Sequence, residues 1–204
     1  DNSQSFSPDP VAETTSYMVV LYGRFETGSA ALARPRDEIV YFAGDTNFGR
    51  AMKMALIADG AAERVADAVL SITGGRPLIV NLEGVILPNV PQALDNMTLA
   101  MPEELTIAWL KRLGVAGAGL ANNHAMDLGP TGYAETLAAL REAGIPAFGQ
   151  GDVLALGNLD VVGLSDLDTN AARQIDLLTP ELLDRLVRPD ANRAVAGFVH
   201  WGRE

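Results

Sequence analysis

Short apolar runs alternate with helix-length amphipathic segments over most of this chain, and this alternation restricts the fold more than any other feature. The runs with strand composition are residues 39–43, 78–80, 115–121, 145–148, 159–164 and 194–199. The segments with helix composition are residues 51–71, 102–113, 130–143 and 180–188. Strands separated by helices form βαβ units around a largely parallel sheet. The sequence therefore predicts an α/β fold built in layers.

Apolar spacing predicts which face of two of these helices is buried, and proline content predicts one irregular segment. The positions expected to face the core are Val65, Ala68, Val69 and Ile72 in one helix, which ends at Gly74-Gly75, and Ile107, Leu110 and Leu113 in the next. Residues 84–102 contain Pro88, Pro91 and Pro102 and are predicted to be irregular. Irregular segments of this length often act as lids or binding loops.

The chain divides at about residue 38. Residues 1–37 form a predicted N-terminal arm: residues 1–16 are rich in Ser, Asp, Thr and Pro, which predicts flexibility, and Tyr17–Phe25 is a possible edge strand. Residues 38–204 carry the regular pattern and form the predicted α/β domain. The chain begins with Asp1, so we expect either a removed leader or a trimmed terminus.

Composition excludes several classes of protein. The 204 residues are 48% hydrophobic, enough for a substantial core. The formal net charge of −11 would repel a phosphate backbone, so no nucleic-acid partner is expected. The absence of cysteine excludes disulfides and Cys-based zinc sites. No apolar run approaches the ~18 residues that span a bilayer.

Polar residues of metal-ligand type follow four of the predicted strands. They are Asp45 with Asn47, Asn81 with Glu83, Asn122-Asn123-His124, and His200 with Glu204. Parallel strands end at the same edge of a sheet, so we expect these side chains to converge, where ligands bind open α/β sheets. Carboxylates, amides and imidazoles together suit Mn, Fe or Zn better than Ca. The pattern predicts one or two divalent ions that activate water.

Each of these residues also has an ordinary structural interpretation. Gly44-Asp45 is a common turn, and a lone histidine such as His124 is more often hydrogen-bonded than catalytic. Asp127 is expected to support the loop or to cap the helix that begins near Pro130. Trp201 is expected to pack. The coincidence of four similar strand ends favours a site over these alternatives.

Four motifs, in this order, resemble those of the poly-γ-glutamate capsule biosynthesis (CapA) family, which is related to the calcineurin-like metallophosphoesterases. They are GDTNFGR (44–50), NLEGVIL (81–87), LANNHAMDLGPTGYAETLAALREAGIPAFG (120–149) and HWGRE (200–204). The resemblance covers about residues 38–204 and implies a layered α/β sandwich of the metallophosphoesterase type. It implies metal ligands at Asp45, Glu83 (the bridging carboxylate), Asn123 and His200, with His124 as the general acid.

The chain departs from the wider superfamily in three places. Asn47 stands where a second ligand histidine is expected, and Glu83 replaces the usual aspartate. A later Gly-His-x-His segment is absent from the 204 residues, so the resemblance implies a domain that is incomplete at its C-terminus. Glu204 belongs to the family's His-Trp-Gly-x-Glu pattern and receives no role.

Two functions follow from the residues and the resemblance, and a third interpretation is a scaffold without a site. The first is a metal-dependent hydrolase that cleaves a phosphoester or a polymer bond, acting on a small molecule or an anionic polymer. The second is a non-catalytic accessory protein of capsule assembly, which binds a ligand or other capsule-assembly proteins. By resemblance the protein is expected outside the cytoplasm, at the cell envelope, with membrane contact only through a removed leader or an anchor.

Overall fold

The computed structural model describes residues 20–22, 39–57, 60–95, 97–149, 152–166, 179, 181 and 193–201. The strands are β1 (Val20–Tyr22), β2 (Tyr41–Thr46), β3 (Leu78–Leu82), β4 (Val85–Leu87), β5 (Ala100–Pro102), β6 (Val115–Gly119), β7 (Ala147–Phe148), β8 (Val153–Leu156), β9 (Leu159–Ser165) and β10 (Ala194–His200). The helices are α1 (Arg50–Leu56), α2 (Ala61–Thr73), α3 (Glu103–Arg112) and α4 (Gly129–Glu142). None of the helices in these described ranges is long and apolar enough to cross a membrane.

The strands form two four-stranded sheets and a small pair, which confirms the α/β class. The first sheet has the order β2-β3-β6-β7, and all of its pairs are parallel. The second has the order β1-β10-β9-β8, with one parallel pair, β10 with β9. The third is the parallel pair of β4 and β5. The predicted layered α/β sandwich with largely parallel strands is therefore confirmed. The apolar pattern alone did not show that the strands divide between two sheets, or that β1 and β8 pair antiparallel.

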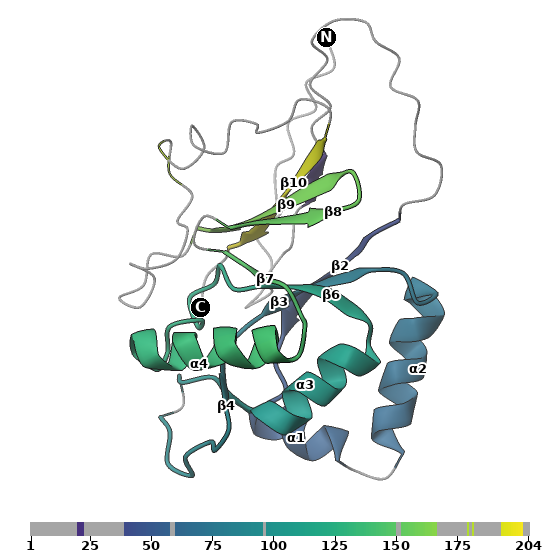
Figure 1. Ribbon diagram of the computed structural model, residues 1–204. Helices are drawn as coiled ribbons and strands as arrows, with labels where there is room; N and C mark the ends of the chain where they lie inside the picture. Colours follow the sequence, from purple (N-terminus) through teal and green to yellow (C-terminus); the bar gives the residue numbers. More distant parts are fainter. Residues whose placement is uncertain are drawn as a thin grey trace, which may run out of the picture.

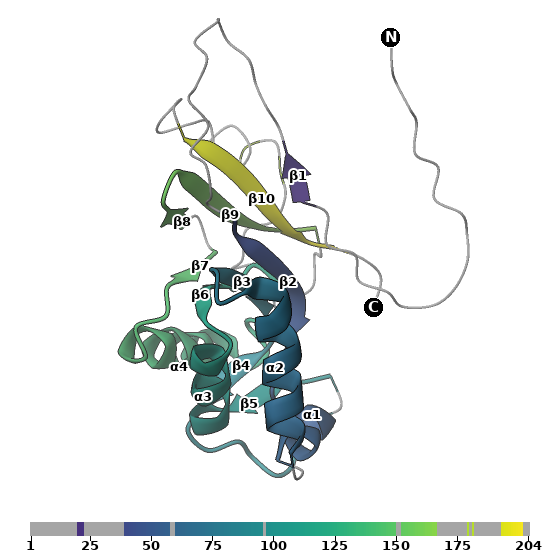
Figure 2. The same ribbon diagram turned by 90° about the vertical axis from the view of Figure 1, so that its right-hand side faces the viewer.

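The two large sheets and the helices form layers. Helices α2, α3 and α4 lie on one side of the first sheet, and the second sheet lies on the other side (Figures 1 and 2). Side chains of β3 alternate between the layers: Val80 and Leu82 pack with the helices, whereas Ile79 packs with Phe148 and Phe198 toward the second sheet. Because both faces of β3 are covered, the strand reads as a continuous apolar run.

The segment predicted as one helix over 51–71 is two helices, and its predicted core face is only partly correct. Gly60 breaks it, with a backbone φ of 68° that favours glycine. In α2 the buried positions are Ala66 and Thr73, and Val69 packs against the core as predicted, whereas Val65 is 42% and Ile72 is 69% exposed. The two buried positions carry small residues, so Val65 and Ile72 did not mark the inward face. In α3 the expected face is correct, and Leu110 and Leu113 are buried.

Several strand boundaries also differ from those predicted. Residues 84–102 are not wholly irregular, because they include β4 and β5, three residues each. Strands β2 and β3 continue to Thr46 and Leu82, so Asp45 and Asn81 lie within strands rather than after them. Strand β1 lies inside the expected edge strand and pairs antiparallel with β10 at the edge of the second sheet. The rest of the 1–37 arm and the helix predicted at 180–188 fall outside the described residues, except for Glu181.

Arg193 ties the start of β10 to the neighbouring hairpin of β8 and β9. Its Nε donates to Oδ1 of Asp160 at 2.8 Å, and its Nη1 donates to the carbonyl oxygen of Gly157 at 2.8 Å. The Asp160 side chain is buried in β9, so the ion pair satisfies a carboxylate inside the sheet. The contacts of Arg193 fix the position of the start of β10, and therefore help to set the position of His200 at its end.

Candidate metal centre

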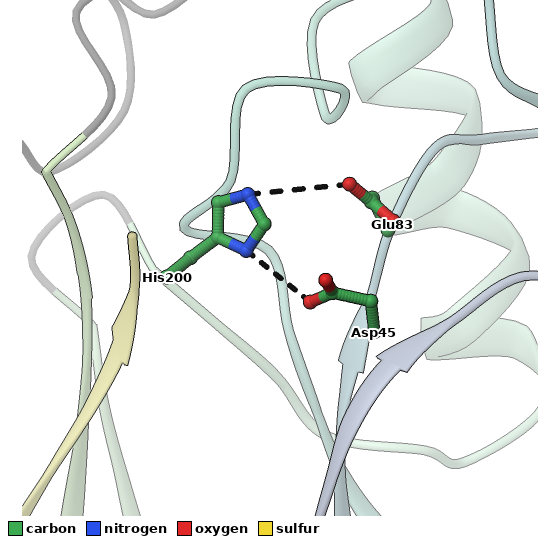
Figure 3. Close-up of side chains that lie close together, drawn as sticks. All are labelled: Asp45, Glu83 and His200. Atoms are coloured by element: carbon green, nitrogen blue, oxygen red, sulfur yellow. Dashed lines mark hydrogen bonds and ion pairs between the residues drawn. The ribbon is translucent and has the colours of Figure 1, made fainter. Parts of the chain in front are cut away.

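Asp45, Glu83 and His200 form a group of metal-ligand type where the two sheets meet. Each offers one ligand atom, and the three atoms lie within 4.8 Å of one another. Asp45 comes from β2, Glu83 follows β3, and His200 ends β10, with its imidazole between the two carboxylates (Figure 3). Their side chains are 26%, 18% and 6% exposed, respectively. The group is therefore open enough for an ion to enter and buried enough for charge to act strongly.

The first two ligands are positioned by the parallel pairing of β2 and β3. Asp45 lies opposite Asn81 in the register, after an irregularity that follows Phe42. The backbone N–H of Glu83 donates to the carbonyl oxygen of Thr46 at 3.1 Å, which extends the pairing by one residue beyond β3. Both carboxylates therefore stand at the carboxyl ends of neighbouring strands, as the sequence predicted.

His200 reaches the same place from the other sheet. Its Nδ1 lies 3.2 Å from Oδ1 of Asp45, and its Nε2 lies 2.8 Å from Oδ1 of Asn123. The Nε2 atom is also 4.0 Å from Oε1 of Glu83. The sequence predicted this convergence at the edge of one parallel sheet, and that reason was wrong. The residues meet because two sheets pack with the ends of β2, β3 and β10 together.

The loop after β6 places Asn123 and His124 beside Glu83. Both loop residues are buried. Nε2 of His124 lies 4.0 Å from Oε1 of Glu83, the same distance that separates this oxygen from Nε2 of His200. Nδ1 of His124 donates to Oδ2 of Asp127 at 2.8 Å. The Glu83 carboxylate is therefore shared between two imidazoles from different parts of the chain.

The donor set is chemically suited to a transition-metal ion. Asp45 and Glu83 supply carboxylate oxygens and His200 supplies an imidazole nitrogen, a mixture that suits Mn, Fe or Zn better than Ca. Asn123 adds an amide oxygen within hydrogen-bonding distance of His200. Asp45, Glu83 and His200 could hold a metal ion.

The remaining predicted site residues have other contacts. Asn47 donates to the carbonyl oxygen of Glu83 at 2.6 Å and accepts from the N–H of Gly49 at 2.7 Å. Asp127 supports the loop rather than capping α4, because the N-cap position is Leu128 and has no side-chain cap. Trp201 packs against an apolar cluster of the second sheet, as expected. Glu204 lies outside the described residues.

The supporting asparagines Asn81 and Asn122 are buried and hydrogen-bonded to each other. Sequence analysis missed the small residues that line the cavity beside Asp45 and His200, which include Gly44, Gly119 and Gly163. Gly119 and Gly163 lie within strands, where glycine often marks a close approach of another group. That signal was present in the sequence and was not used.

A comparison with protein families identifies the family of this chain. A family model described as bacterial capsule synthesis protein PGA_cap matches residues 39–158, more than half of the chain. The chain therefore belongs to this family of capsule synthesis proteins. No curated protein matches the chain. The matched span contains Asp45, Glu83, Asn123 and His124, whereas His200 lies beyond it.

Proposed function

We propose that this capsule synthesis protein is a metal-dependent hydrolase that cleaves a phosphoester or a bond of the capsule polymer. The observation that carries the proposal is the position of Oε1 of Glu83, 4.0 Å from Nε2 of both His124 and His200. A carboxylate between two imidazoles, with Asp45 beside one of them, is typical of sites where a bridging acid holds ions next to a proton donor.

The residues of the chain have separate tasks in this proposal. Asp45, Glu83 and His200 hold the metal, with Asn123 as an additional oxygen donor. A divalent ion bound there supplies positive charge that activates water and offsets charge on a phosphate. His124 gives a proton from Nε2 to the leaving oxygen. Asp127, which accepts the Nδ1 proton of His124 at 2.8 Å, orients the ring and stabilises its charged form.

The substrate we propose is anionic, either a small phosphoester or the capsule polymer itself. The net charge of −11 would repel such a polymer over most of the surface, so the metal provides the local positive charge that admits it. We further propose that the protein works at the cell envelope with other capsule-assembly proteins. The membership of a capsule synthesis family supports this location and these partners.

Metal binding is the first test. The 204-residue chain, stripped of metal, is titrated with Mn²⁺ and with Zn²⁺ by calorimetry, and its melting is followed with each ion. We expect near-stoichiometric binding and a higher Tm by mass action. Glu83→Gln weakens binding, whereas Glu142→Gln, an exposed change on α4, leaves it unchanged. The absence of binding to the unaltered chain would remove the proposed site.

Turnover is the second test. We expect hydrolysis of an aryl phosphodiester that requires added metal and falls about 10²- to 10⁴-fold in His124→Ala, because a general acid contributes about that much. The variant should still bind metal, since His124 is not among the three ligands of the group. Full activity in His124→Ala would overturn its role. Metal and poly-γ-glutamate binding without turnover of any phosphoester would favour the accessory function instead.

A further inference from the structure

Two buried asparagine side chains connect the backbone near the site to the candidate metal ligands. Asn122 hydrogen-bonds to Asn81, and Asn81 in turn lies against both Asp45 and His200. Asn122 is fully buried, and Asn81 is 5% exposed. We call this chain of hydrogen bonds, from Asn122 through Asn81 to Asp45 and His200, the amide relay.

Backbone groups allow the Asn122 amide only one orientation. Its Nδ2 donates to the carbonyl oxygen of Leu82 and to Oδ1 of Asn81, each at 3.0 Å. Its Oδ1 accepts from the backbone N–H of His124 at 3.1 Å. A reversed amide would set its oxygen against two acceptors and its nitrogen against a donor. A buried polar group that is left unpaired destabilises the fold, so the reversed orientation is excluded.

The orientation of Asn122 then decides that of Asn81. Because Oδ1 of Asn81 accepts from Asn122, its NH₂ group must point the other way. There Nδ2 donates to Oδ1 of Asp45 at 2.6 Å and lies 3.0 Å from Nδ1 of His200. These two partners also lie 3.2 Å from each other, so Asn81, Asp45 and His200 are all in mutual contact.

The NH₂ group of Asn81 determines the hydrogen-bonding pattern of His200. An amide nitrogen can only donate, so Nδ1 of His200 accepts and carries no proton. The proton of the neutral ring is therefore on Nε2, where it is donated to Oδ1 of Asn123 at 2.8 Å. A proton on Nδ1 would instead be donated to Oδ1 of Asp45 at 3.2 Å, but it would then face the NH₂ group of Asn81 at 3.0 Å.

We propose that Asn122 is a positioning residue that acts through Asn81 to hold Asp45 and His200 in one geometry before metal binds. Asp45 belongs to the first sheet and His200 to the second, and the Asn81 amide touches both. Asp45 and His200 therefore lie together before metal binds, and Nδ1 of His200, which carries no proton in this arrangement, could accept an ion in place of the Asn81 N–H. This inference rests on the proposed metal-dependent function, but the relay itself can be tested in metal-free protein.

The first experiment needs no variant. In ¹⁵N-labelled, metal-free protein, the Asn81 side-chain nitrogen should show a through-hydrogen-bond coupling to Nδ1 of His200, and the His200 proton should be found on Nε2. A proton on Nδ1, or the absence of this coupling, would overturn the relay. This result does not depend on whether the chain binds metal or turns over a substrate.

The second experiment breaks the relay at its buried start. Asn122→Asp removes the donors to Leu82 and Asn81 and should abolish the coupling between Asn81 and His200. Metal affinity should fall about 10- to 100-fold, the usual effect of removing a group that orients a ligand. Asn89→Asp adds the same charge at an exposed loop position and serves as the control. Asn122→Ser, which adds no charge, replaces Asn122→Asp if that variant does not fold.

The outcomes separate this inference from the proposed function. Unchanged metal affinity and unchanged coupling in a folded Asn122 variant would overturn the positioning role. An unaltered chain that shows the coupling but binds no metal would contradict the proposed function and leave the relay as a structural link between the sheets, which also overturns its role in preparing a metal site.

Discussion

Asp127 joins His124 to the segment that precedes β5. Its Oδ2 accepts a hydrogen bond from Nδ1 of His124 at 2.8 Å and another from the backbone N–H of Leu99 at 2.6 Å. One carboxylate oxygen therefore holds both the proposed general acid and the end of the loop between β4 and β5. Sequence analysis expected Asp127 to support the loop or cap a helix, and it did not predict the contact with His124.

The contributions of the two hydrogen bonds of Asp127 and of its negative charge can be tested with different substitutions. Asp127→Asn keeps an oxygen that accepts from both donors, so we expect a Tm near that of the unaltered protein. The proposed hydrolysis should still fall about 10-fold or more, because the carboxylate no longer stabilises a protonated His124. Asp127→Ala leaves the Leu99 N–H without its acceptor and should cost about 1–3 kcal/mol of stability. Equal activity in Asp127→Asn and the unaltered protein would contradict the electrostatic role.

Substitution of Gly49 by alanine should destabilise the protein, whereas the same substitution at Gly44 should not. A Cβ on Gly49 would overlap the carbonyl oxygen of Ala100 in β5, whereas a Cβ on Gly44 would meet nothing within 4 Å. The φ of −95° at Gly49 suits alanine, so the penalty is steric alone. Gly49→Ala should lower the free energy of unfolding by about 1–3 kcal/mol. Urea denaturation of both variants measures this, and equal stability of the two would show the prediction to be wrong.

The outward position of Ile72 on α2 can be checked against a core residue of α3. Leu110 is 0% exposed, and Leu110→Ala should cost about 2–5 kcal/mol through lost contacts and a cavity. Ile72→Ala should change stability by no more than about 0.5 kcal/mol, as is usual for exposed positions. Chemical denaturation of the two variants gives both values. A large loss of stability in Ile72→Ala would contradict the exposed position of this side chain and favour the core face predicted from the sequence.

Asp95 should titrate at lower pH than an ordinary aspartate. Its carboxylate accepts hydrogen bonds from the backbone N–H groups of Met97 and Thr98 and from the Thr98 hydroxyl, and these bonds lower its pKa. A lowered pKa in the folded state means that the turn is stabilised above the unfolded pKa of about 3.9 and loses this stabilisation as pH falls through the folded value.

The titration of Asp95 can be followed through its carboxyl carbon by NMR. We expect a midpoint below the ordinary aspartate value, and Thr98→Val, which removes one donor, should move the midpoint upward. A midpoint at or above the ordinary value would contradict the hydrogen bonds of this turn. Because Leu99 follows Thr98 and donates to Asp127, the order of this turn bears on the position of His124.

Local pattern was enough to predict the alternation of strands and helices. The apolar runs marked β2, β3, β6, β9 and β10, because a buried strand needs a continuous apolar run. The polar residues near the ends of three of these strands include Asp45, Glu83 and His200, which the structure brings together, and their role as a site stays a prediction. Strands of three residues, such as β4 and β5, have too few positions to give such a signal.

Only the tertiary structure decided how the site is assembled. No local pattern indicates that β10 belongs to a second sheet, because its composition matches that of the strands in the first. Nor does the sequence show that Asn81 points toward His200, or that Asp127 holds His124. Sheet pairing and buried hydrogen bonds depend on contacts between residues far apart in the chain. The periodicity of a local segment does not predict such contacts. The sequence by itself determined the chemistry of the strand ends, and the packing of two sheets determined that this chemistry meets at one place.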